Sequence, residues 1–389
     1  MRLRNMKVNW LKMKCNSEEL CSGHSDVVRD GHTEVIIVSP SLDASKNVSG
    51  ISSVTQFVID NNKECAYVHF ELGRKDNERG GLFRVFSLLR CFLLWKRMLR
   101  HHPNALVHYN FPLSKASIIR DPLFMREAKR KGRKMVVHIH GGVFLTHYDE
   151  APSIIKRILR GVFAWNVPFV VLGKGEKQIV EQTFGAKKVY SLPNCVDLRD
   201  AEKFKREYNK TRPLVIGYIG RLAETKGMNY LLGACCELKQ QGVPFVLKLA
   251  GAEEFPGCCL PRFTSSLGEQ FVYSGIVSGE GKTEFLKSLD VFVLPSFFEG
   301  LPMSLLECMS FGAVPVTTAV GSIPDVVEDE KDGLYIKVKD VKSIVVALER
   351  LHNNRNLLEV LGQKARERIF RQFNPKVYVE TLNEIYNTI

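Results

Sequence analysis

The sequence predicts an α/β protein with two doubly wound domains that face one another across a cleft. Two observations lead to this fold class: short, continuously apolar runs alternate with longer helical stretches, and the alternation occurs twice in 389 residues. Strands that are apolar throughout are typical of parallel sheets covered by helices on both faces. Because the chain is also long enough for two hydrophobic cores, we expect two Rossmann-like domains.

Each half is expected to contribute six strands. In the first half the apolar, β-branched runs lie at 34–40, 65–70, 105–110, 134–140, 168–173 and 187–193. In the second half they lie at 214–220, 244–251, 270–275, 290–296, 313–318 and 333–338. Open α/β sheets bind ligands beyond the carboxyl ends of their strands, so two facing sheets would place the site between the domains.

The domain boundaries follow from changes in this pattern. The first residues, 1–33, are basic and lack both a clean apolar run and a small-residue cleavage site. We therefore expect a poorly ordered leader there and not a secretory signal peptide. The other boundaries are expected at 34–200 for the first domain, 201–212 for a charged linker, 213–372 for the second domain and 373–389 for a C-terminal helix that packs back on the first domain.

Composition and charge restrict the class of protein. A hydrophobic content of 45% with 25% charged residues is typical of a soluble globular chain, and no apolar run is long enough to span a membrane. The ten cysteines form no C-x-x-C pair, which favours a reducing, cytosolic compartment, and the adjacent pairs Cys235–Cys236 and Cys258–Cys259 offer poor geometry for a shared metal or a disulfide. The net charge of +13 comes from residues 1–200 and favours an anionic partner.

A candidate phosphate-binding tract follows the first strand of the second half. Gly220 ends that strand, and Arg221 and Lys226 follow it just before a helix. A glycine at a strand end lets the backbone approach a ligand closely, and two cations near a helix N-terminus suit a diphosphate. Taken alone, the tract equally fits a solvated loop with ordinary surface charges.

Two glutamates lie eight positions apart in SFFEGLPMSLLECMSFG, residues 296–312. Pro302 suits the start of a helix, which places Glu299 in the preceding loop and Glu307 about a turn and a half into the helix. Such carboxylates can hold vicinal hydroxyls, as the acidic residue of dinucleotide-binding folds holds a ribose. The alternative is that Glu299 caps the helix and Glu307 pairs with a nearby cation.

Together, these segments resemble the group 1 (GT4-type) retaining glycosyltransferases. The E-x7-E motif at 299–307 lies between V-L-P-S at 293–296 and F-G-A-V-P-V at 311–316, and G-R-L-x-x-x-K-G stands upstream at 220–227. The resemblance runs almost continuously over 213–372. It implies the GT-B fold and a nucleotide-diphosphate sugar as the donor substrate.

The resemblance also implies a role for each matching residue of the second half. Arg221 and Lys226 would bind the diphosphate and stabilise charge on the leaving group. Glu299 would contact hydroxyls of the donor sugar, and Glu307 would hold those of the ribose. The pocket would be completed by the backbone at Gly220, Gly300, Leu301 and Pro302 and by a base-binding segment, 273–276, that ends at Ile276.

The first half matches the family more loosely. The resemblance implies that His140, the last residue before two glycines, is the histidine that such enzymes place in the cleft, whereas His138 is expected to point into the core. Ser49 and Gly50 follow the first strand, where relatives carry a Gly-rich turn near the donor phosphates. Only one glycine is present here instead of a pair.

The implied function is that of a retaining hexosyltransferase in bacterial surface polysaccharide biosynthesis. The donor is expected to be a UDP-sugar before a GDP-sugar, and the acceptor a glycan or a polyprenyl-diphosphate-linked sugar. No further cofactor is expected, and no metal, because no Asp-x-Asp pair follows a strand. Two other classes remain open: a nucleotide-sugar 2-epimerase on a similar fold, and a nucleic-acid-binding protein that uses the basic half.

The basic half also contains a candidate membrane contact. In RVFSLLRCFLLWKRMLRHH, residues 84–102, the apolar side chains Val85, Leu88, Leu89, Phe92, Trp95 and Leu99 form a stripe flanked by arginines and lysines. Such a helix can lie on an anionic membrane, or it can simply pack in the first domain. Basic residues at 126–134 add to the charge. The expected location is the cytoplasm, at the inner face of the membrane, with no nucleic acid as partner.

Overall fold

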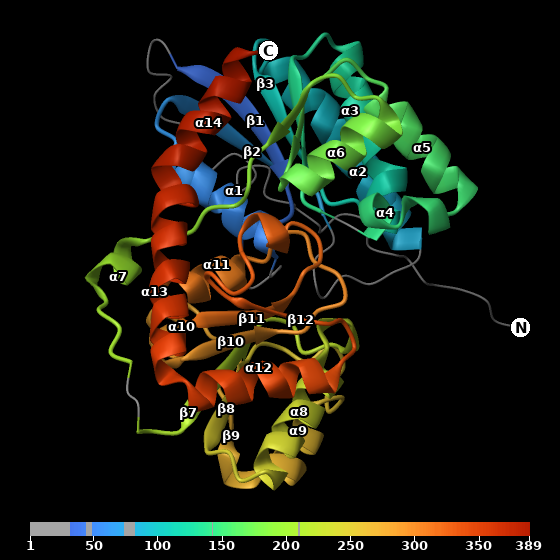
Figure 1. Ribbon diagram of the computed structural model, residues 1–389. Coiled ribbons are helices and arrows are strands. Elements are labelled where there is room, and N and C mark those ends of the chain that lie inside the picture. Colours follow the sequence, from blue (N-terminus) through green and yellow to red (C-terminus); the bar gives the residue numbers. More distant parts are fainter. Residues whose placement is uncertain (1–31, 44–48, 74–81, 142, 209–210) are drawn as a thin grey trace, which may run out of the picture.

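The computed structural model describes residues 32–389 except 44–48, 74–81, 142 and 209–210. The expected leader therefore lies outside the described residues apart from His32 and Thr33. The described chain forms two six-stranded parallel sheets, each packed between helices (Figure 1). The fold class predicted from the sequence, two doubly wound α/β domains, is confirmed.

The first sheet has the strand order β2-β1-β3-β4-β5-β6. Its strands are β1 Thr33–Ser39, β2 Cys65–Glu71, β3 Leu106–Phe111, β4 Met135–Ile139, β5 Phe169–Val171 and β6 Val189–Ser191. The buried side chains of α1 Gly50–Asn61 and the C-terminal α14 Pro375–Asn387 cover one face. The other face is covered by α2 Leu82–His101, α3 Lys115–Arg130, α5 Ser153–Phe163 and α6 Lys174–Phe184.

The second sheet has the strand order β12-β11-β10-β7-β8-β9. Its strands are β7 Leu214–Ile219, β8 Phe245–Ala250, β9 Phe271–Tyr273, β10 Val291–Leu294, β11 Val314–Thr318 and β12 Leu334–Ile336. Its main helices are α8 Met228–Gln240, α9 Leu260–Leu267, α10 Gly279–Ser288, α11 Met303–Ser310, α12 Val341–Asn353 and α13 Arg355–Gln372. The strand order reverses direction between β7 and β10, and such a switch point is where open α/β sheets bind ligands.

All twelve predicted strands are present, and each lies within two residues of its predicted range at both ends. Continuous apolar runs were sufficient because every strand of both sheets has parallel neighbours and helices on its faces. The helix after Glu299 begins at Met303, with Pro302 as its N-cap, and Glu299 lies in the loop before it.

The last two helices join the two domains. Figure 1 shows α13 running along the second domain and α14 continuing along the first. Leu358 and Leu361 of α13 belong to the core of the second domain, whereas Leu382 of α14 is buried against the first sheet. In the same interface Asn62 donates a hydrogen bond to Asn383 at 2.6 Å. The C-terminal segment therefore fixes one domain relative to the other.

Three histidines on or just after β3 and β4 form a cluster beside α14, in which His108 and His138 are buried and His140 is half-buried. His108 Nδ1 lies 2.6 Å from the hydroxyl of Tyr386, and His108 Nε2 lies 3.2 Å from His138 Nδ1. The rings of His138 and His140 stack with centroids 4.2 Å apart, and His138 is fully buried, so its predicted core position is confirmed. Burial lowers the pKa of His108 to about 4. All three are therefore neutral near pH 7.

This burial predicts a loss of stability in mild acid. Below the ordinary histidine pKa of about 6.5, the unfolded chain binds a proton at His108 that the folded chain does not, so stability falls as the pH falls toward about 4. Linkage gives a loss of about 2 kcal/mol from this residue between pH 7 and pH 5. Urea unfolding of His108→Gln at both pH values should show a correspondingly smaller loss than the wild type. The exposed His101→Gln serves as the control, and equal losses in all three proteins would contradict the prediction.

Candidate active site at the domain interface

The loop after β7 lies against the carboxyl end of β8. The Gly220 amide donates to the Ala250 carbonyl at 3.0 Å, and the Gly251 amide donates to the Gly275 carbonyl at 2.7 Å. A Cβ on Gly251 would lie 1.9 Å from the Gly220 carbonyl oxygen, so no side chain fits there. Gly220 and the segment ending at the exposed Ile276 are thereby brought together at adjacent strand ends.

Lys226 and Glu299 form an ion pair across the switch point of the second sheet. The Lys226 Nζ lies 2.6 Å from Glu299 Oε1, and the glutamate side chain is only 9% exposed. Lys226 belongs to the loop after β7 and Glu299 to the loop after β10. Gly227 joins these loops, because it adopts a left-handed conformation (φ 76°) and a Cβ on it would lie 2.2 Å from the Pro295 carbonyl oxygen.

Arg221 lies beside this ion pair with its guanidinium unpaired. The Tyr218 hydroxyl donates to the Arg221 carbonyl at 2.7 Å and so fixes the backbone of the loop. Burial raises the pKa of Tyr218 well above its usual value, the Glu299 carboxylate raises it further, and Arg221 lowers it. The exposed guanidinium makes no hydrogen bond or ion pair with another described residue, and it is therefore available to bind an anion.

Glu307 pairs with a lysine that the sequence did not single out. Lys282 of α10 places its Nζ 2.6 Å from Glu307 Oε1, and both side chains are partly exposed. The alternative interpretation from the sequence, in which Glu307 pairs with a nearby cation, is therefore the arrangement that the structure shows. The corresponding reading for Glu299 is wrong: its hydrogen-bonding partner among the described residues is Lys226 and not the amides of α11.

His140 reaches the same place from the first domain. It follows β4, and the next residue, Gly141 (φ 73°), touches Gly300: a Cβ on Gly141 would lie 2.6 Å from the Gly300 Cα. A Cβ on Gly300 would lie 3.2 Å from the His140 carbonyl oxygen. The backbone after β4 and the loop that carries Glu299 are therefore in direct contact, which neither half of the sequence could indicate alone.

The remaining predicted residues lie around this contact. Ser49 is the N-cap of α1, where its hydroxyl accepts a hydrogen bond from the Ser52 amide at 3.2 Å. A Cβ on Gly50 would lie 3.8 Å from the side chain of Met303, so the start of α1 lies near the start of α11 and near Pro302. Leu301 is buried, and its carbonyl accepts from the Asn194 side chain at 3.0 Å.

Sequence reasoning missed Lys282 and Asn110, the second of which contacts His140. Each lies in a different element from its partner and at least 25 residues away along the chain. No spacing or motif marks them.

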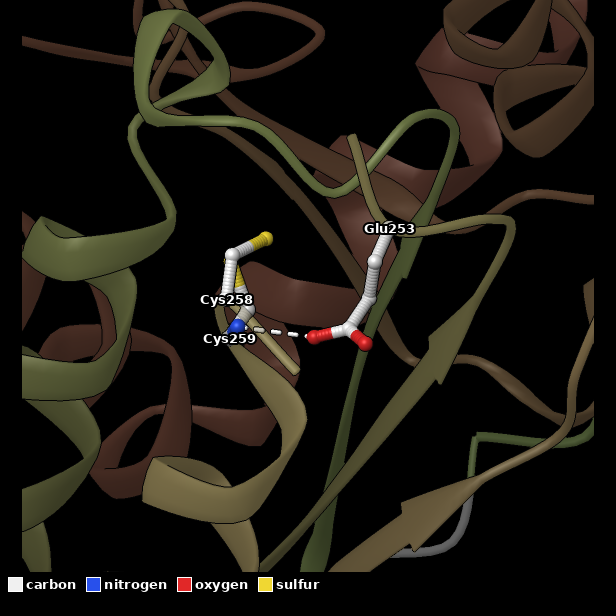
Figure 2. Close-up of side chains that lie close together, drawn as sticks. All are labelled: Glu253, Cys258 and Cys259. Atoms are coloured by element: carbon white, nitrogen blue, oxygen red, sulfur yellow. Dashed lines mark hydrogen bonds between the residues drawn. The ribbon is translucent and has the colours of Figure 1, made fainter. Parts of the chain in front are cut away.

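A further cluster of possible metal ligands lies behind the loop after β7. Figure 2 shows Glu253 close to Cys258 and Cys259, and one possible ligand atom from each residue lies within 4.8 Å of the other two. The two sulfurs are 3.4 Å apart, although an adjacent pair was expected to have poor geometry for a shared metal. The Glu253 carboxylate accepts hydrogen bonds from the amides of Gly257, Cys259 and Leu260. Burial opposes ionisation, but these three donors hold the pKa of Glu253 below its usual value. The cluster is thus accounted for by capping of α9.

The second domain matches a known family. The family model "Glycosyl transferases group 1" matches residues 200–368. The putative colanic acid biosynthesis glycosyltransferase WcaL of Salmonella typhimurium is 29% identical over 190 residues, which are 46% of each chain. The UDP-Gal:alpha-D-GlcNAc-diphosphoundecaprenol alpha-1,3-galactosyltransferase of Escherichia coli is 25% identical over 277 residues, 67% of this chain and 70% of that protein.

Both domains together match solved structures. The sucrose-phosphate synthase of Thermosynechococcus elongatus superposes with a TM-score of 0.74 at 16% identity, over 92% of this chain and 99% of that one. The chain spans about half the length of several of the curated relatives that it matches. The comparisons therefore identify the second domain as that of a group 1 glycosyl transferase, and the two domains together as the GT-B fold.

Proposed function

We propose that the protein is a retaining hexosyltransferase that transfers a sugar from a nucleotide-diphosphate donor to a glycan or lipid-linked acceptor in bacterial surface polysaccharide biosynthesis. One observation carries the proposal: Lys226 pairs with Glu299 between the loops after β7 and β10, the unpaired Arg221 belongs to the first of these loops, and the second touches the backbone that follows His140. This is a cationic site with one carboxylate, beside a switch point, as a charged donor sugar requires.

The two cations supply the main catalytic effect. As the bond between the anomeric carbon and the diphosphate breaks, negative charge grows on the leaving oxygen, and Arg221 and Lys226 stabilise it. In a front-face reaction the acceptor hydroxyl forms its new bond on the same side. Its proton passes to the departing phosphate oxygen. Configuration is retained, and no protein base is needed at the reacting carbon.

Glu299 acts as a ligand of the sugar and not as the nucleophile. Retaining glycoside hydrolases use two carboxyl groups about 5 Å apart, one as the acid and the other as the nucleophile that attacks the anomeric carbon. Here the Glu299 carboxylate is held by Lys226 at 2.6 Å, so it is oriented by the same cation that binds the diphosphate. Glu307, held by Lys282, is the proposed partner of the ribose hydroxyls.

The donor is proposed to be a UDP-sugar and the acceptor a polyprenyl-diphosphate-linked glycan. Support comes from the galactosyltransferase relative, whose name specifies both UDP-Gal and a diphosphoundecaprenol acceptor. A thermal-shift panel of nucleoside diphosphates separates the bases, since a ligand at about 100 Kd adds roughly 2.7 kcal/mol of stability. UDP should raise the melting temperature more than GDP. The reverse order would show that the donor carries guanosine and not the proposed uridine.

A face of α2 is the proposed membrane contact of this enzyme. Trp95 and Leu99 are fully buried, so the predicted stripe packs in the first domain along its second half. Its first half faces outward at Val85 and Leu89, which are 55% and 58% exposed. Phe86 and Leu93, which the predicted stripe did not include, extend this outward row and are 71% and 66% exposed. None of the helices in the described part of the chain is long and apolar enough to cross a bilayer.

Cations gather in a groove that adjoins this outward row at Leu93. A groove of about 500 Å³ between α2 and α3 is lined by Arg90, Lys96, Arg97, Arg100, Arg130 and Lys131, with Glu127 as its acidic residue. Exposed apolar side chains rimmed by arginine and lysine are typical of surfaces that bind anionic lipid. We infer that α2 docks the first domain on the inner face of the cytoplasmic membrane, where a lipid-linked acceptor would be found.

The proposed chemistry predicts that Arg221→Ala and Lys226→Ala each lower the transfer rate by about 10²–10³, because each removes one cation from the leaving group. The assay uses radiolabelled UDP- and GDP-sugars with a polyprenyl-diphosphate sugar as acceptor. Lys364→Ala, an exposed site on α13, is the control, and thermal unfolding checks that the fold is intact. Epimerised sugar in place of transfer, turnover of no nucleotide sugar, or near-normal rates in both variants would reject the proposal.

The membrane contact predicts co-sedimentation with vesicles that contain anionic lipid, and little with neutral ones. Phe86→Ser combined with Leu93→Ser should weaken binding at least tenfold, because each side chain loses the free energy of burial in the bilayer. Val346→Ser, 62% exposed on α12 of the second domain, is the matched control. The proposed membrane contact through α2 is wrong if the wild type fails to sediment with anionic vesicles at low salt, or if the double variant binds as well as the wild type.

A further inference from the structure

Asn110 connects the sheet of the first domain to His140. It lies near the end of β3 and is buried. Its Nδ2 donates to the Val38 carbonyl at 2.9 Å and lies 3.3 Å from the hydroxyl of Thr55, while its Oδ1 lies 2.6 Å from His140 Nε2. A carbonyl oxygen can only accept, so the contact with Val38 fixes which end of the amide faces the histidine.

This orientation determines the tautomer of His140. Because the amide oxygen of Asn110 is an acceptor, Nε2 of His140 must carry the hydrogen, and Nδ1 is left bare. Burial, with a smaller electrostatic contribution from the His108 ring, lowers the pKa of His140 to about 3, so the ring stays neutral near pH 7. Nδ1 has no hydrogen-bond partner among the described residues. It is also not fully buried, so a ligand atom can reach it.

The position of this bare nitrogen matters because His140 adjoins the donor site. Its carbonyl and the following Gly141 contact Gly300, the residue after Glu299. A bare imidazole nitrogen at this place can only accept, and the group that a donor sugar offers to an acceptor is a hydroxyl hydrogen.

We propose that Asn110 is a positioning residue that presents Nδ1 of His140 as a hydrogen-bond acceptor to a hydroxyl of the donor sugar. The proposal rests on the glycosyltransferase function proposed above and adds a specificity rule to it. A donor that lacks this hydroxyl leaves the bare nitrogen without a hydrogen-bond donor. Sites built to bind a hydroxyl reject analogues without it strongly.

The first experiment needs no substrate. Nitrogen-15 spectra of the side-chain imidazoles, with the His140 signal assigned from its loss in His140→Gln, report which ring nitrogen carries hydrogen. In the wild type at pH 7 we expect a protonated Nε2 and a bare Nδ1. In Asn110→Leu, which has similar size but no acceptor, we expect a mixture of both tautomers. A wild type with hydrogen on Nδ1, or an unchanged tautomer in Asn110→Leu, would overturn the proposal.

The second experiment measures kcat/KM for the preferred nucleotide sugar. Asn110→Leu should lower it about tenfold, and the loss should shrink for donors deoxygenated at the hydroxyl that His140 binds. Thr55→Val is the control, because it removes the other side-chain contact of Asn110 and leaves the one to His140 intact. A loss that is the same for every deoxygenated donor would mean that Asn110 supports only the fold.

Asn110→Asp gives a third, independent readout. The carboxylate oxygen that replaces Oδ1 still accepts from Nε2, so the tautomer should be retained, and thermal unfolding measures what the loss of the donor to the Val38 carbonyl costs. The carboxylate charge favours protonation of His140, so kcat/KM should fall more steeply in acid than in the wild type. The other titratable groups near His140 are His108, His138 and Glu176, whose Oε1 lies 3.5 Å from the Cβ position of Gly141. They are common to both proteins, so parallel pH profiles would count against the proposal.

These experiments separate the two proposals. If no nucleotide sugar is turned over by the wild type, the proposed function fails, while the imidazole spectra still decide whether Asn110 sets the tautomer. If turnover is normal but the spectra of Asn110→Leu match the wild type, the positioning role fails and the function stands.

Discussion

The contact between Gly141 and Gly300 is the constraint on which the site depends. It is the point at which the backbone after β4 of the first domain meets the loop after β10 of the second, and there is no space for a Cβ on Gly141. Because these two backbone segments touch directly, His140 and Glu299, which directly precede Gly141 and Gly300, lie on either side of the same contact. Larger residues would separate the domains and with them the two halves of the site.

Charges are arranged around that contact so that the carboxylates are not left unpaired without a ligand. Glu299 is held by Lys226, and Glu307 is held by Lys282. Arg221 is the cation of this group whose side chain has no partner among the described residues. A bound diphosphate would therefore meet one free guanidinium and one lysine that an ion pair already holds in place. Because Lys226 is ordered before binding, less conformational entropy would be lost when the ligand binds.

The domain arrangement itself is stabilised far from the site. The helices α13 and α14 pass from the core of the second domain to the face of the first sheet, and Asn62 and Asn383 form a buried hydrogen bond there. On the same sheet Tyr386 of α14 contacts His108, which leads through His138 to His140. A continuous set of packed side chains therefore joins the C-terminal helix to the candidate site.

The sequence by itself determined the twelve strands, the two-domain fold class and most of the loops that form the site. It could do so because the apolar runs are local, and because parallel sheets put every strand's carboxyl end on one edge, so Arg221, Lys226 and Glu299 were expected on the same edge. The pairing of β7 with β10, which makes Lys226 and Glu299 neighbours, was set by the tertiary structure. Only the tertiary structure decided the partners of Glu307 and His140, namely Lys282 and Asn110, and which row of α2 faces outward. These depend on how separate elements pack, and packing partners far apart in the chain leave no periodic signal in the sequence.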